Sequence, residues 1–223
     1  LWARAQPMRR SKCWSFWMDD LIVIKIQKDL TYDLIEKNHY LHRLPNVVYS
    51  YGLYKQNILL GICTFGIPAS LNLCEGLCGK DYKDYVVELN RLFLIKNEKN
   101  LASFFVSRCL KMLPKPKIVV SYADKNNGHC GYIYQATNFL YTGLSAKRTN
   151  PKNSHGLHSR TVWKPNQETI ERPRKHRYVY MVGGKSDRRK LLKNLKYKVQ
   201  DYPKSENVNY NVGNIPSSQI LLL

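Results

Sequence analysis

Apolar residues recur along this chain in short runs, and the spacing within each run is typical of either a strand or a helix. Compact apolar runs between polar turns predict strands, and apolar residues three or four apart predict helices. The expected elements are a strand at 21–27, a helix capped by Asp29 or Thr31 and running to 40, strands at 47–54, 58–65 and 85–95, a helix at 101–113, a strand at 118–122, a short helix at 131–138 and a strand at 139–144. This order predicts an α/β (α+β) fold with a mixed central sheet flanked by helices.

Turn and breaker residues support this division. The polar triplet at 55–57 separates two apolar runs, which indicates a β-hairpin. Pro114 ends the helix that starts at 101, because proline cannot continue a helix. Further along, the run YVYMV at 178–182 predicts another strand, and we expect Ser186 to cap a helix after it.

Positive charge is in large excess and is concentrated late in the chain. The 223 residues carry 36 Lys and Arg against 16 Asp and Glu, a formal net charge of +20. Residues 141–200 alone hold 16 basic and three acidic side chains. This excess favours a polyanionic partner, with nucleic acid first and an anionic membrane surface second. No run of about 18 apolar residues is present to span a bilayer, so we expect a cytoplasmic protein without a membrane partner.

The six cysteines give no sign of a structural framework. They are isolated except for Cys74 and Cys78, so neither a disulfide scaffold nor a four-ligand zinc site is predicted. Reduced thiols are the simplest interpretation.

Polar groups gather after the strand at 118–122. Asp124 follows the carboxyl end of this strand, where open sheets present ligand groups, although a turn cap is the alternative role. His129 lies between Gly128 and Gly131, which permit a tight turn, and it either faces the same cleft or caps the next helix. His39 is either a base or ligand, or a surface histidine at a helix end.

Two tyrosines follow at 132 and 134, and on a helix they point about 200° apart. One of them is therefore expected in the core. Tyr134 carries a phenol able to donate a proton, and Gln135 and Asn138 carry amides able to hold a base edge. We expect Asp124, His129 and Tyr134 to surround one pocket, with His39 arriving from the first half of the chain.

The element order resembles that of acyl-CoA N-acyltransferases of the GNAT type. In that superfamily an aromatic residue is followed by an Asn-Phe or Gly-Phe pair leading into a strand. Tyr132, Tyr134, Asn138, Phe139 and Gly143 are arranged in this way. The glycine-rich turn that holds the coenzyme pyrophosphate in the superfamily has no glycine here at 96–102.

A narrower resemblance rests on several blocks together. They are NHYLHRLP at 38–45, GICTFGIPAS at 61–70, ELNRLFL at 88–94, SYAD at 121–124, GHCGYIYQATNF at 128–139 and RPRKHRYVY at 172–180. Together they resemble the Mom family of phage DNA-modification proteins. This resemblance implies conversion of adenine in DNA to N6-carbamoylmethyl adenine, which hides phage DNA from host restriction enzymes. It also implies a location in the cytoplasm of the bacterial host.

The resemblance further implies cofactors and site residues. Acetyl-CoA would be the donor and iron the metal, with His39, Asp124 and Tyr134 as reactive or metal-binding groups and with Arg91 and Ser103 near the coenzyme. Imidazole, carboxylate and phenolate are all acceptable iron ligands. A carbamoylmethyl product contains a nitrogen that acetyl-CoA lacks, so either a second nitrogen source or a different donor is needed.

With this resemblance the chain divides into four parts. We expect a non-native or disordered N-terminal extension at 1–17, a GNAT-like catalytic core at 18–145, a basic extension at 146–205 that completes the fold and contacts DNA, and a flexible tail at 206–223. The oligomeric state stays open, and a homodimer is among the alternatives.

Double-stranded DNA is the expected partner, held through phosphate contacts around the strand at 178–182. The expected contacts are Arg172, Arg174, Lys175, Arg177, Lys185, Arg188, Arg189 and Lys190. Two other functions remain open, a GNAT-type enzyme acting on a protein or small-molecule amine and a non-catalytic nucleic-acid-binding protein.

Overall fold

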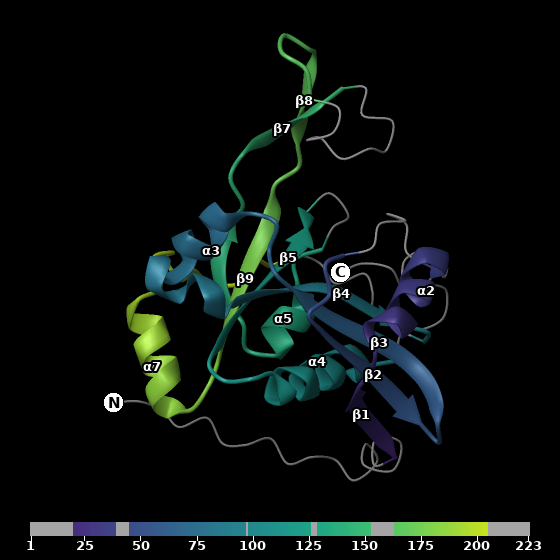
Figure 1. Cartoon of the computed structure of the whole chain (residues 1–223). Coiled ribbons are helices and arrows are strands. Elements are labelled where there is room, and N and C mark those ends of the chain that lie inside the picture. The colour runs from purple at the N-terminus through teal and green to yellow at the C-terminus, as the bar shows by residue number, and fades with distance from the viewer. Residues whose placement is uncertain (1–19, 39–44, 97, 126–128, 153–162, 205–223) are drawn as a thin grey trace.

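The computed structural model describes residues 20–38, 45–96, 98–125, 129–152 and 163–204. These residues form a seven-stranded sheet with helices on both faces and a separate two-stranded ribbon (Figure 1). The expected mixed sheet flanked by helices is confirmed. The segments 1–17 and 206–223, together with His39, lie outside the described residues.

The sheet has the strand order β1-β2-β3-β4-β5-β9-β6. Its strands are β1 (Leu21–Lys25), β2 (Tyr49–Lys55), β3 (Ile58–Gly66), β4 (Val86–Leu94), β5 (Lys117–Asp124), β6 (Leu140–Leu144) and β9 (Lys175–Val182). Every neighbouring pair is antiparallel except β4 and β5, which run parallel. The long crossover that a parallel pair requires is supplied here by a helix.

Helices cover both faces of the sheet. They are α2 (Lys28–Asn38), α3 (Leu71–Cys78), the 3-10 helix η2 (Lys80–Tyr85), α4 (Leu101–Met112), α5 (Tyr132–Ala136) and α7 (Lys185–Lys193). Buried side chains of α4 and α5 pack with Val87, Val119 and Tyr178 on one face. Those of α3 and α7 pack with Val86, Val120 and Val179 on the other. Among the described residues, no helix is both long and apolar enough to cross a membrane.

The hairpin expected at 55–57 is confirmed. Lys55 pairs with Ile58, and the two residues between them, Gln56 and Asn57, have φ angles of 48° and 64°. Positive φ at both central positions gives a turn whose twist matches that of the flanking strands.

The sequence prediction was wrong at three places. The segment 71–85 was not assigned, but it forms α3 and η2, and Ser70 caps α3 by accepting a hydrogen bond from Leu73 N at 3.3 Å. Helix α2 begins at Lys28, before the expected caps at Asp29 and Thr31. Helix α7 begins at Lys185 after Gly184, so Ser186 lies within the helix, and the Asp187 carboxylate accepts from Gly184 N at 3.0 Å.

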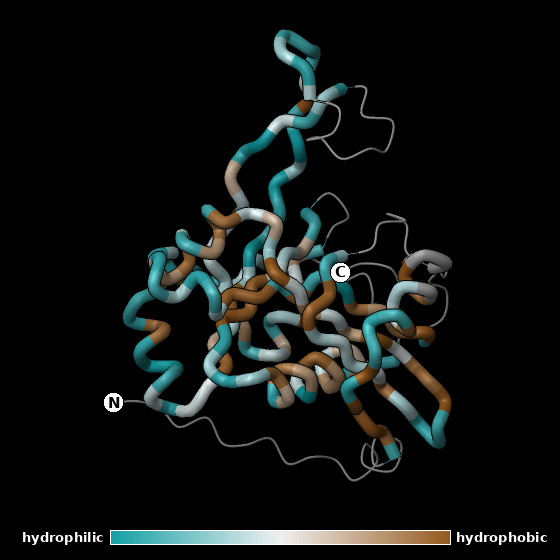
Figure 2. Tube along the Cα trace, in the orientation of Figure 1, coloured by the Kyte–Doolittle hydropathy of each residue, from teal (hydrophilic) through white to brown (hydrophobic). Residues whose placement is uncertain are grey.

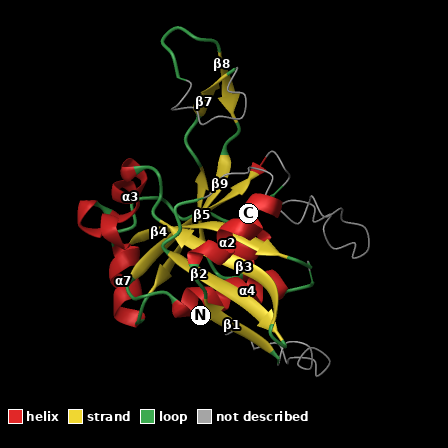
Figure 3. Ribbon diagram, turned by 45° about the vertical axis from the view of Figure 1, so that its right-hand side comes forward, coloured by secondary structure: helices red, strands yellow, loops and turns green. Residues whose placement is uncertain are grey.

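The two-stranded ribbon consists of β7 (Arg148–Pro151) and β8 (Thr169–Arg172). It connects β6 to β9 and stands clear of the sheet and its helices (Figure 3). Hydrophilic residues dominate the ribbon and α7, whereas the sheet and the inner side of α4 are hydrophobic (Figure 2). The ribbon therefore contributes little to the core.

Candidate functional site

The parallel strands β4 and β5 separate part-way along their length. They pair only at 86–88 with 118–120. Beyond these residues β4 stays paired with β3, and β5 stays paired with β9. Separation of neighbouring strands toward their carboxyl ends is where open α/β sheets present ligand groups. We call residues 89–94 of β4 and 121–124 of β5 the split, and treat it as the candidate site.

A β-bulge shapes the β4 side of the split. Thr64 pairs with Arg91 and Phe65 with Leu89, so Asn90 is an extra residue on β4. Thr64 Oγ1 donates to Asn90 Oδ1 at 2.6 Å, and Asn90 Nδ2 donates to Asn46 O at 3.0 Å. Bulges re-aim side chains and are over-represented next to active sites.

Tyr134 reaches the split from the α5 face of the sheet. Its ring is fully buried, with centroids 5.3 Å from Phe139 and 5.1 Å from Tyr178. Its hydroxyl hydrogen-bonds Ser121 Oγ at 2.7 Å, and Ser121 Oγ also donates to Leu89 O at 3.0 Å. Burial raises the pKa of Tyr134 well above its usual range, against the opposing effect of Ser121. The phenol therefore stays protonated and helps to join β5 to β4 where they separate.

The neighbours of Tyr134 have structural roles. Gln135 Nε2 donates to Cys130 O at 3.1 Å and to Tyr178 Oη at 3.2 Å, so its amide is used within the fold and not on a base edge. Asn138 has a φ of 62° just after α5 and forms the turn into β6. Gly131 has a φ of 82°, and a Cβ there would lie 2.5 Å from the Tyr178 ring, so glycine is required.

Charged groups meet the split on the opposite face. Glu88 is the last β4 residue paired with β5, and burial raises its pKa while Arg91 and Lys175 oppose this shift. Tyr122 lies on the same face, and burial, followed by the charge of Glu88, raises its pKa to about 12. The result is a half-buried carboxyl group at the start of the split whose pKa two nearby cations, Arg91 and Lys175, act to lower.

Asp124 and His129 come together at the carboxyl end of β5. Asp124 Oδ2 lies 3.2 Å from Lys175 Nζ, and His129 N donates to Asp124 O at 3.2 Å. Burial lowers the pKa of His129, and the nearby Asp124 opposes this shift. Its Nε2 is buried and has no hydrogen-bond partner among the described residues. This imidazole is therefore neutral at physiological pH and able to accept a proton.

The expected single pocket around Asp124, His129 and Tyr134 is wrong for Tyr134. Side chains alternate along β5, so Ser121, which binds Tyr134, and Asp124 lie on opposite faces of the sheet. Asp124 and His129 share one end of the split, while Tyr134 is enclosed in the core.

The two residues expected near a coenzyme lie on different elements. Arg91 follows the bulge on β4, and its Nη1 donates to Asn90 O at 2.7 Å. Ser103 lies in the first turn of α4, where its Oγ donates to Asn100 O at 3.0 Å. Their contact with a coenzyme stays a prediction.

The eight expected DNA contacts do not form one patch. Arg177 is buried, donates to Thr142 Oγ1 and O at 2.9 Å each, and has its guanidinium 3.5 Å from the Tyr197 ring centroid. Because it is enclosed in this way, its assignment as a DNA contact is wrong. Lys175 pairs with Asp124, and Arg174 Nε donates to Ser145 O at 2.6 Å. The exposed members are Arg172 on the ribbon and Lys185, Arg188, Arg189 and Lys190 on α7.

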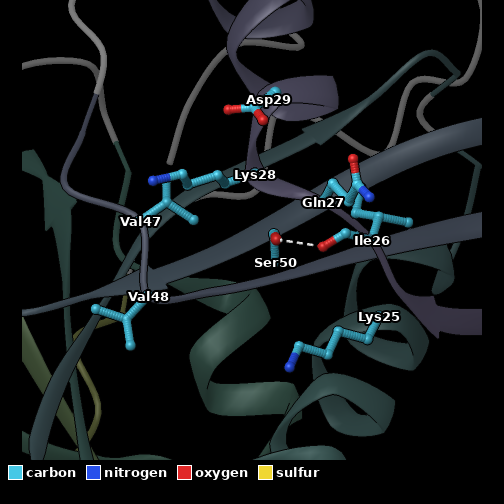
Figure 4. Close-up of a pocket in the computed structure, with 8 residues that line it drawn as sticks. All are labelled: Lys25, Ile26, Gln27, Lys28, Asp29, Val47, Val48 and Ser50. Carbon is cyan, nitrogen blue, oxygen red and sulfur yellow. Dashed lines mark hydrogen bonds between the residues drawn. The ribbon is translucent and has the colours of Figure 1, made fainter.

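A surface pocket lies away from these residues, where β1 leads into α2 beside the start of β2 (Figure 4). It is lined by Lys25, Ile26, Gln27, Lys28, Asp29, Val47, Val48 and Ser50. Ser50 Oγ donates to Ile26 O at 2.7 Å, which joins the two sides of the pocket. None of the expected site residues lines it.

Residues 20–204 match the Mom protein family. The chain belongs to the Mom family. A relative in this family, the methylcarbamoylase Mom of Escherichia phage Mu, is 25% identical over 191 residues, which cover 77% of this chain and 78% of the relative. The expected Mom resemblance is confirmed.

Solved structures with a similar arrangement are acetyltransferases. An N-acetyltransferase of Staphylococcus aureus is 15% identical with a TM-score of 0.43, covering 73% of this chain and 98% of that one. NAA60 of Arabidopsis thaliana, in complex with acetyl-CoA, is 10% identical with a TM-score of 0.45, covering 73% and 99%.

The iron site that the Mom resemblance implied does not fit the described residues. No group of three or more His, Cys, Asp or Glu residues in the described ranges could hold a metal ion. Asp124 is paired with Lys175, and Tyr134 lies on the other face of β5. The third expected ligand, His39, lies outside the described residues.

Sequence analysis missed Glu88 as a candidate functional residue. The signal was present, because Glu88 is the one acidic residue in the run YVVELNRLFL, most of which is apolar. Its importance depends on where β4 leaves β5, and that point is set by long-range pairing.

Proposed function

We propose that this protein attaches a carbamoylmethyl group to the N6 amine of adenine in phage DNA, and so protects that DNA from host restriction. The observation that carries the proposal is the match of residues 20–204 to the Mom family, whose phage Mu relative is named a methylcarbamoylase. The net charge of +20 supports a polyanionic substrate.

The groups at the split suit the proton transfer that this reaction needs. The adenine N6 amine must lose a proton when nitrogen forms its new bond. Neutral His129 would accept that proton, and the negative charge of Asp124, which acts to raise the pKa of His129, would stabilise the imidazolium that forms. Glu88 is a second acceptor, because burial raises its pKa toward the working pH.

An acyl-CoA donor fits the chain's own residues at α4. This helix starts at Leu101, and its N-cap residue Asn100 makes no side-chain capping bond, so backbone N–H groups remain for phosphate oxygens. Ser103 lies in this first turn. Acetyl-CoA would supply two carbons and no nitrogen, so the amide nitrogen requires a second donor, and the coenzyme thiol would leave when that amide forms. Joining N6 to the methyl carbon of the acetyl group would in addition require a two-electron oxidant.

Nucleoside mass analysis tests the proposal. DNA from bacterial cells expressing the protein should contain a modified deoxyadenosine heavier by one carbamoylmethyl group, and Asp124→Asn should abolish it without unfolding the protein. Lys198→Gln, a charge change on an exposed residue outside the split, serves as the control and should leave the modification in place. An unmodified adenine pool in cells that contain folded parent protein would overturn the proposal.

A further inference from the structure

We propose that the β7–β8 ribbon is the DNA-binding element of this protein, and that its Arg148–Arg172 face enters a groove of duplex DNA. This inference rests on the proposed function for its choice of polyanion. It assigns binding to residues of the ribbon and not to the basic helix α7.

The register of the ribbon separates charge between its two faces. Arg148 pairs with Arg172 and Asn150 with Ile170, and these four residues share one face because side chains alternate along a strand. The opposite face carries Glu171, paired with Thr149. Arg148, Arg172 and Ile170 are exposed.

A directly opposed pair of arginines is costly in an isolated ribbon. Like charges facing each other across two strands are destabilising, and two-stranded sheets are marginally stable alone. An anion between the two guanidinium groups removes the repulsion and turns the pair into a site for one or two phosphates. The Arg148–Arg172 pair therefore indicates an anionic partner in a way that scattered surface lysines do not.

The two arms of the ribbon are joined to each other at both described ends, so Arg148 and Arg172 are held in this register. At its base Ser145 N donates to Lys175 O at 2.8 Å, and Lys175 N donates to Ser145 Oγ at 2.9 Å. Arg174 Nε adds the bond to Ser145 O at 2.6 Å. Further out, Lys152 N donates to Glu168 O at 2.9 Å, and their side chains form an ion pair at 2.6 Å.

The shape of the ribbon fits duplex DNA. Two antiparallel strands lie about 4.8 Å apart, and the major groove, about 12 Å wide, admits a two-stranded ribbon. Arginine forks suit phosphate oxygens and guanine edges, and Asn150 on the same face suits adenine edges. Trp163, which is 54% exposed, precedes β8 and offers a stacking surface.

Position also favours the ribbon over α7. The ribbon joins β9 at Lys175, which pairs with Asp124. The positive charge of Arg148 acts to lower the pKa of Tyr122 at the split. Helix α7 follows the other end of β9, whose eight residues span roughly 25 Å. Figure 1 shows the ribbon and α7 at opposite ends of the molecule. DNA held by the ribbon therefore has a base next to the split.

The test is equilibrium binding of a fluorescent 20-base-pair duplex at several salt concentrations, with no acyl donor present. Arg148→Gln with Arg172→Gln should weaken binding by at least about tenfold and lower the salt slope by about 1.8, because each phosphate that is no longer neutralised accounts for about 0.9. The matched control is Arg188→Gln with Arg189→Gln on α7, which makes the same charge change and should leave affinity and slope close to those of the parent. Neither variant should unfold at a lower temperature than the parent, because all four side chains are exposed and the ribbon variant loses a like-charge repulsion.

Three results would overturn the inference: unchanged binding in the ribbon variant, an equal loss in the α7 variant, or no binding of duplex by the parent. The two experiments together distinguish failure of this inference from failure of the proposed function. Ribbon-dependent binding with no modified adenine in cells would reject the proposed reaction and support DNA binding by the ribbon. Modified adenine with unchanged binding in the ribbon variant would support the proposed reaction and reject DNA binding by the ribbon.

Discussion

Glu88 shows how one side chain can be set apart by its surroundings. It lies in a strand whose neighbouring positions, Val86, Val87 and Leu89, are buried and apolar. Burial disfavours its charged form, and Arg91 and Lys175 recover part of that cost. A carboxylate in such surroundings lowers the stability of the folded protein, which is typical of groups that take part in catalysis.

The first prediction concerns the stability of Glu88→Gln. The folded-state pKa of Glu88 is raised above its unfolded value of about 4.3, so its contribution to stability is fully present below that value. The contribution is lost as the pH rises through the folded pKa. Urea unfolding should therefore show a larger free energy of unfolding for the variant, relative to the parent, at pH 7 than at pH 4. A difference between the two proteins that does not change with pH would contradict this.

The second prediction concerns His129. Because burial lowers its pKa, the imidazole loses its proton below the ordinary value of about 6.5. The rate of adenine modification should rise with pH on the acid side and level off below pH 6.5, because only neutral imidazole accepts a proton. His129→Gln should remove this rising limb. A profile whose midpoint lies above 6.5 in the parent would rule out His129 as the acceptor.

At the scale of elements, the bulge in β4 decides which residues face the split. Asn90 is the extra residue, so Glu88 and Arg91 fall on the same face although they are three positions apart. Gly66 allows this arrangement, because a Cβ there would lie 1.6 Å from Asn46 O. The bulge, its two side-chain bonds and Gly66 therefore act as one unit.

The third prediction is a double-mutant cycle on this unit. Asn90→Ala removes both side-chain bonds and leaves the buried Thr64 hydroxyl without its acceptor, so it should lower the free energy of unfolding by about 1–3 kcal/mol. Thr64→Val should cost less, and the two changes should be less than additive because they share one bond. Full additivity in urea unfolding would mean that the bond contributes nothing.

Local patterns predicted most of the sheet, and long-range pairing explains what they missed. Periodicity identified β1 to β6 and α4, and the positive-φ turn at Gln56 and Asn57 is a local preference. The position of β9 between β5 and β6 could not be predicted, because it depends on pairing across about 50 residues. Tyr134 was expected beside Asp124, but its partner Ser121 and Asp124 lie on opposite faces of β5. Glu88 was overlooked because long-range pairing sets the point where β4 leaves β5.

At the scale of the whole molecule, the two proposed ligands approach from different directions. The first turn of α4 would receive the coenzyme phosphates, and the β7–β8 ribbon would hold DNA. These elements are joined through the sheet, with β5 and β9 between them. Binding of one ligand should therefore not obstruct the other.

The fourth prediction tests this independence. Ser103→Asp places a negative charge in the first turn of α4 and should weaken acetyl-CoA binding in calorimetry at least about tenfold through repulsion of the phosphates. Ser107→Asp, one turn further along the same helix, is the control and should have a much smaller effect. Duplex DNA affinity should be the same in both variants. A parent protein with no measurable acetyl-CoA affinity would exclude this coenzyme as the donor.

The central place of β9 has a consequence for the nascent chain on the ribosome. Strand β5 ends at Asp124, but its antiparallel partner begins only at Lys175 and β6 also pairs with that later strand. At a synthesis rate of about 5–20 residues per second, β5 waits roughly 3–10 s and β6 roughly 2–6 s with exposed edges. During this interval an unpaired apolar strand edge is a template for aggregation. Production of this protein should therefore benefit from lower growth temperatures or added chaperones, and truncation before residue 175 should give insoluble chains.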